Sequence, residues 1–172
     1  MSQKVKRGFL LLVLIIFFLF LYSPIQIFRS DLDGDNNQEI LFIWRGRAYL
    51  VKERRLVWQS DPEWKVERIT FGDANNDGKP ELLVSLWKFG SYGSSLPFWL
   101  KENTKEWGNH LFLYQWGEGK LKMVWGSSTL DEPIKEMLVG DFDTDGQNEL
   151  RVLEKEKVGY WRWQGFNFFK ES

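Results

Sequence analysis

The sequence contains no cysteine and only one histidine. The absence of cysteine excludes a disulfide framework, a cysteine-ligated zinc site and a lipid-modified cysteine anchor. The formal net charge is −1, so the overall charge gives no reason to expect nucleic acid as a partner. Enzyme signatures are also missing. There is no G-x-S-x-G elbow, and "GSYGSS" at 90–95 lacks the spacing of a phosphate-binding loop. His110, the lone histidine beside a predicted strand, is expected to be structural. Together with the missing signatures, this leads us to expect that the protein is not an enzyme.

Long apolar runs are absent except at the N-terminus. Lys4, Lys6 and Arg7 precede "GFLLLVLIIFFLFLY" at 8–22. As a helix this run spans about 22 Å, less than the hydrocarbon core of about 30 Å. No pair of small residues marks a cleavage site, which favours an uncleaved membrane anchor over residues 1–23. A cleaved signal peptide and a buried helix of a soluble protein are the alternatives. With an anchor, the rest of the chain faces the extracytoplasmic side; with a cleaved signal, it is secreted.

The rest of the chain is rich in aromatic residues, which are 17% of the sequence and include ten tryptophans. Apolar runs of about five to seven residues alternate with Gly, Asn and Asp, a pattern that predicts short strands and turns. Four such runs recur three times, in repeats of about 24–60, 61–127 and 128–172. The sequence therefore predicts an all-β domain over 24–172 after the N-terminal hydrophobic helix. Its architecture is expected to be three four-stranded antiparallel blades of the propeller type.

Each repeat contains one acidic turn. The three turns are "SDLDGDNNQEILFI" at 30–43, "GDANNDGKPELLVS" at 72–85 and "GDFDTDGQNELRVL" at 140–153. Counted from the first Asp, residues with side-chain oxygens stand at offsets 0, 2, 4 and 8. They are Asp31, Asp33, Asp35, Glu39; Asp73, Asn75, Asp77, Glu81; Asp141, Asp143, Asp145, Glu149. Offset 5 holds Asn or Gly, the residues that most readily adopt the positive φ that a tight loop needs there.

This spacing predicts a calcium site in each turn, up to three in all. Calcium takes six to eight oxygens, and alternate side chains of a short loop can supply several of them. Crowded carboxylates repel one another, and a dication removes that conflict. The alternative is a set of Asp-rich and Gly-rich hairpin turns that hold no metal.

The motifs "FGDANNDGKPELLV" and "VGDFDTDGQNELRVL" resemble FG-GAP and VCBS-type repeats, the calcium-loop blades of integrin α-chain propellers and of many bacterial surface proteins. The first turn lacks the preceding glycine and carries Asn36 in place of the loop glycine. The resemblance implies β-propeller blades, calcium in the first hairpin of each blade, and a role in adhesion or partner binding. Since propellers generally have at least four blades, three blades imply an open arc, an unusually compact fan, or two chains that pair as a homo-oligomer.

The expected function is a membrane-anchored, extracytoplasmic calcium-binding module for adhesion, protein interaction or assembly. The alternative is a carbohydrate-binding, lectin-like module that uses the long segment 88–109. Tyr92, Trp99 and Trp107 are the candidate contacts for a protein or glycan in that segment.

Overall fold

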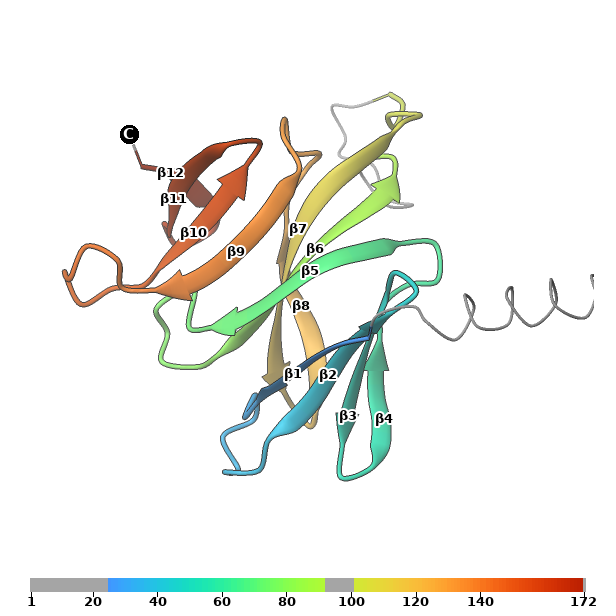
Figure 1. Cartoon of the computed structure of the whole chain (residues 1–172), viewed down its shortest axis with the longest axis vertical. Helices are drawn as coiled ribbons and strands as arrows, with labels where there is room; N and C mark the ends of the chain where they lie inside the picture. The colour runs from blue at the N-terminus through green and yellow to red at the C-terminus, as the bar shows by residue number, and fades with distance from the viewer. Residues whose placement is uncertain (1–24, 92–100, 172) are drawn as a thin grey trace, which may run out of the picture.

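The structure, a computed structural model, describes residues 25–91 and 101–171. This part of the chain is all-β and forms three four-stranded antiparallel sheets, as predicted (Figure 1). The strands are β1 (Gln26–Ser30), β2 (Glu39–Trp44), β3 (Arg47–Lys52), β4 (Arg55–Gln59), β5 (Lys65–Gly72), β6 (Glu81–Phe89), β7 (Trp107–Gly117), β8 (Lys120–Gly126), β9 (Ile134–Gly140), β10 (Glu149–Glu154), β11 (Lys157–Trp163) and β12 (Phe168–Lys170).

Each sheet is built from strands that are consecutive in the chain. We name them sheet A (β1–β4), sheet B (β5–β8) and sheet C (β9–β12). The limits of the sheets follow the three repeats seen in the sequence. The predicted N-terminal anchor lies outside the described residues. Within 25–91 and 101–171 no helix is long and apolar enough to cross a bilayer.

Sheet B lies between the other two (Figure 1). One core cluster joins sheets A and B and includes Leu41, Leu50, Leu82 and Tyr114, all buried. A second joins sheets B and C through buried residues such as Leu83, Leu113, Leu150 and Trp161. Because neighbouring residues of a strand point to opposite faces, sheet B buries alternate residues in the two cores. The burial of β6 from Glu81 to Leu86 follows from this double packing.

The register makes the three sheets directly comparable. The glutamate that closes each acidic turn begins the second strand, and it stands opposite one residue of the third strand. Glu81 pairs with Gln115. The pairs Ile40–Val51 and Leu150–Trp161 place Glu39 opposite Lys52 and Glu149 opposite Arg162 in the same way.

Candidate metal centre

The three acidic turns join the first two strands of their sheets and lie on the same side of the molecule (Figure 1). In each turn three carboxylates offer oxygens within 4.8 Å of one another. The groups are Asp31, Asp33, Glu39; Asp73, Asp77, Glu81; and Asp141, Asp143, Glu149. The other predicted residues, Asp35, Asn75 and Asp145, accept hydrogen bonds from backbone N–H groups of the same turns.

The first aspartate organises the backbone of its turn. Asp31 accepts hydrogen bonds from the N–H groups of Gly34 at 2.8 Å and Asn36 at 2.9 Å. The first aspartates of the other turns accept from Gly78 and Gly146, both at 2.9 Å. The three donors at offset 5 are Asn36, Gly78 and Gly146, and they have φ of 68°, 85° and 88°. The positive φ predicted for this position is therefore confirmed.

The closing glutamates are almost fully buried, with exposed fractions of 2%, 0% and 1% for Glu39, Glu81 and Glu149. One oxygen of each, Oε2, accepts the backbone N–H of the residue after the first aspartate. The donors are Leu32 at 2.8 Å, Ala74 at 2.9 Å and Phe142 at 3.0 Å. Such bonds hold a buried carboxylate in place. The other oxygen, Oε1, turns toward the third strand.

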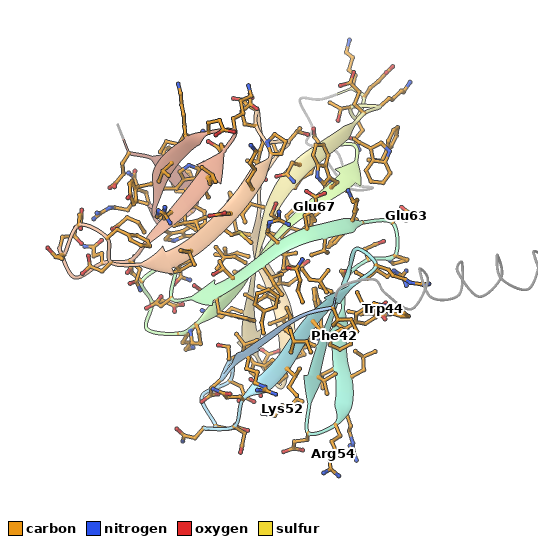
Figure 2. The ribbon with its side chains drawn as sticks, viewed as in Figure 1. Phe42, Trp44, Lys52, Arg54, Glu63 and Glu67 are labelled. Atoms are coloured by element: carbon orange, nitrogen blue, oxygen red, sulfur yellow. The ribbon has the colours of Figure 1, made fainter. Side chains whose placement is uncertain are left out.

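In the first turn this second oxygen meets a lysine. Lys52 Nζ donates to Asp33, to Asp35 at 2.6 Å and to Glu39 at 3.2 Å. Figure 2 shows Lys52 toward the end of sheet A that carries the turn. The contact with Asp33, followed by that with Asp35, raises the pKa of Lys52 above its usual range. The hydrogen bond from Lys52 lowers the pKa of Asp35. An ammonium group therefore occupies the point where the carboxylate oxygens converge.

In the third turn an arginine takes the same place. The guanidinium of Arg162 contacts Asp143 at 2.9 Å, Asp145 at 2.5 Å and Glu149 at 2.8 Å. Its Nε also donates to Glu171 at 2.7 Å. The hydrogen bond from Arg162 is the main cause of the lowered pKa of Asp145. Two of the three acidic turns thus carry a basic side chain inside their ring of carboxylates.

The middle turn differs because the facing residue is neutral. Gln115 Nε2 donates to Asp77 Oδ2 at 2.7 Å and to Glu81 Oε1 at 2.8 Å. Burial raises the pKa of Glu81 to about 7. The Gln115 side chain also carries an amide oxygen, which a rotation of the amide would present to the same point. The middle turn is therefore the one that gathers carboxylates around a side chain able to act as an oxygen ligand.

The sequence-based prediction missed the three facing residues and one feature of the backbone. The signal for Lys52, Gln115 and Arg162 was present, because each aligned third strand carries a polar residue at or near its C-terminal end. Recognising it required the cross-strand register. The second left-handed position lies at offset 3, with φ of 76°, 59° and 65° at Gly34, Asn76 and Thr144.

The aromatic contacts predicted in 88–109 are only partly described. Tyr92 and Trp99 lie outside the described residues. Trp107 begins β7, is 57% exposed and packs edge-to-face on Phe89 with ring centroids 6.4 Å apart. An open cavity of about 610 Å³ lies nearby, lined by residues that include Trp64, Lys88 and Phe89.

His110 is buried in β7, in agreement with its expected structural position. Its Nδ1 lies 3.2 Å from the carbonyl oxygen of Ser127, and its ring meets that of Phe112 edge-on. Burial lowers the pKa of His110, and the charge of Lys88 adds to this effect. The fold therefore favours the neutral form of the ring.

Comparison with known proteins found no matching family model, curated protein or solved structure.

Proposed function

We propose that the chain is a membrane-anchored, extracytoplasmic calcium-binding protein of the FG-GAP and VCBS type. Its three sheets act as propeller-type blades in adhesion, protein interaction or assembly. The observation that carries the proposal is that the two carboxylate oxygens of each closing glutamate have different partners, in the same way in all three turns. One oxygen of each closing glutamate is fixed by a backbone N–H, while the other faces the point where the remaining carboxylates converge.

The donor set suits a hard divalent cation. Carboxylate and amide oxygens are the ligands that calcium prefers, and backbone hydrogen bonds hold them ready in the loops. In the middle turn Asp73, Asn75, Asp77 and Glu81 would hold the ion, and the amide oxygen of Gln115 could join them. In the outer turns the ion would have to displace Lys52 or Arg162 from the carboxylates. The middle turn is therefore the first of up to three sites to fill.

The extracytoplasmic location fits this chemistry. Calcium loops of extracellular modules have dissociation constants of about 0.1–1 mM, which suits the calcium levels outside the cell. The N-terminal basic residues and apolar run supply the expected anchor.

The test is thermal unfolding of the full-length chain in detergent, with about 5 mM calcium (about five times the upper end of the expected range of dissociation constants) and with chelator. Calcium should raise the melting temperature by several degrees, because a ligand that binds only the folded state stabilises it. Asp73→Ala should remove most of the gain at low calcium. Lys79→Gln, an exposed charge change in the same turn, is the matched control. An unchanged melting temperature together with no heat of calcium binding would reject the proposal.

A second candidate function is carbohydrate binding. The cavity beside Trp64 and Phe89 combines aromatic faces with Asp61, Glu63 and Lys88, groups that can stack on a sugar ring and bond its hydroxyls. Glycan-array binding that is lost in both Trp64→Ala and Trp107→Ala would favour this function. Retention of binding in Trp64→Ala would exclude the cavity.

A further inference from the structure

The two outer sheets each have one face that is uncovered within the described residues. Sheet B is covered on both faces by the two core clusters, whereas sheets A and C each contribute one face to a core. Large apolar side chains remain exposed on the other faces. On sheet A they include Ile27 at 61% and Leu56 at 55%, and on sheet C Leu138 at 50% and Val158 at 45%.

The uncovered face of sheet A repeats a face that is buried elsewhere in the chain. Ile40 and Phe42 are one and three residues after the closing glutamate of β2, and Leu82 and Val84 hold the same positions in β6. Leu82 and Val84 are fully buried against sheet A. Ile40 is 37% exposed, and the ring of Phe42 stacks on Tyr49 at 5.0 Å. Figure 2 shows Phe42 and Trp44 along β2. The uncovered face of sheet A therefore corresponds to the face that, in sheet B, packs against the preceding sheet of the chain.

The uncovered face of sheet C corresponds to the face of sheet A that is buried against sheet B. Val158 and Tyr160 occupy the register positions that Ala48 and Leu50 hold in sheet A. Ala48 and Leu50 are fully buried against the following sheet B. Tyr160 is 38% exposed, and its ring packs against that of Phe142 with centroids 5.6 Å apart. Sheet C therefore exposes the face that, in sheet A, packs against the next sheet of the chain.

We propose that these two faces bind each other in a head-to-tail pair of two copies of this chain. The uncovered face of sheet A in each copy (face A) packs on the uncovered face of sheet C in the other copy (face C). Sheet A of one copy thereby follows sheet C of the other, as sheet B follows sheet A within one chain. Because each copy carries both faces, two such contacts cover all four faces and close a ring of six sheets. Ring closure is the usual outcome of a heterologous contact whose rotation closes. A pairing of two A faces would leave both C faces exposed.

The internal interfaces predict which residues meet. Phe28 of sheet A and Phe71 of sheet B touch edge-to-face, with ring centroids 6.4 Å apart. The position of Phe28 is held by Leu138 in sheet C, and the position of Phe71 is held by Arg29 in sheet A. Leu138 of one copy should therefore lie beside Arg29 of the other. Both side chains are exposed in the single copy.

The absence of cysteine makes this contact directly testable. Full-length Arg29→Cys and Leu138→Cys chains with tags of different length are produced together in one membrane and oxidised. We expect a disulfide-linked species that carries both tags, at least tenfold more abundant than with Arg29→Cys and Val124→Cys. Val124 is 49% exposed but belongs to sheet B, so it is a matched control.

Three results would overturn the proposal. Efficient cross-linking of Arg29→Cys to itself would mean that two A faces pair. Absence of the mixed species would exclude the head-to-tail contact. A monomer in which the Arg29→Cys thiol is shielded from a water-soluble reagent would mean that the chain covers its own face. The assay is run with calcium and with chelator, so that a failure of calcium binding is seen separately from a failure of pairing.

Discussion

At the residue scale, one position distinguishes the three acidic turns. Lys52, Gln115 and Arg162 occupy the same cross-strand position opposite a buried glutamate. A fixed ammonium or guanidinium repels a metal ion and already satisfies the carboxylates. The neutral amide of Gln115 also hydrogen-bonds two carboxylates, but it carries no charge that repels a metal ion. The charge of this one residue should therefore set how strongly each turn binds calcium.

A reciprocal exchange tests this role. Lys52→Gln should strengthen calcium binding at the first turn at least about tenfold, because a positive charge a few ångströms from the ion is removed. Gln115→Lys should weaken binding at the middle turn by a similar factor. Isothermal titration of the full-length chain measures both, with Lys79→Gln as the control for a change in total charge. Equal affinities in all variants would show that the facing residue does not control the site.

At the element scale, the turns of neighbouring sheets are joined by hydrogen bonds. The backbone N–H of Asn148 donates to Asn76 Oδ1 at 2.7 Å, and Asn76 Nδ2 donates to the Asn148 carbonyl at 3.1 Å. The side chain of Asn148 also donates to the carbonyl of Asp73 at 2.8 Å. These bonds connect the middle and third turns, where β5 and β9 run side by side (Figure 1).

Asn148→Ala should therefore lower the free energy of unfolding by about 1–2 kcal/mol. The variant loses a side-chain hydrogen bond and leaves the Asp73 carbonyl without this partner. Gln38 stands at the same position of the first turn and is exposed, so Gln38→Ala should change stability by less than about 0.5 kcal/mol. Chemical denaturation of both variants measures the difference. Equal losses would show that the contact between the turns contributes nothing of its own.

Much of the element scale could be predicted from the sequence. Apolar runs separated by Gly, Asn and Asp predict all three four-stranded sheets because side-chain alternation and turn chemistry are local properties. The sequence did not reveal that Arg162 lies inside the third turn. That contact joins β11 to the turn between β9 and β10, and it depends on the register.

At the scale of the whole molecule, stability should depend on pH through His110. Its pKa in the folded state is below the ordinary value of about 6.5, because burial disfavours the charged ring. The unfolded chain therefore binds the proton more readily. The stabilising contribution is complete above pH 6.5 and is lost as the pH falls below that value.

The prediction concerns the difference between the wild-type chain and His110→Gln. From pH 7.5 to 5.5 in chelator, the wild type should lose up to about 1 kcal/mol relative to the variant, which cannot titrate. Glu81 acts in the opposite direction: its raised pKa contributes stability at low pH that is lost as the pH rises through about 7. Since Glu81 is present in both chains, its effect cancels. A difference that stays constant with pH would contradict the assignment.

The sequence by itself determined the three repeats, the strand and turn pattern and the acidic residues of the turns. These features follow from short-range periodicity and from the conformational freedom of Asn and Gly. The tertiary structure alone decided what faces each cluster and which sheet faces are uncovered. Both depend on register and on packing between sheets, which bring together residues such as Lys52 and Asp33 that are far apart in the chain.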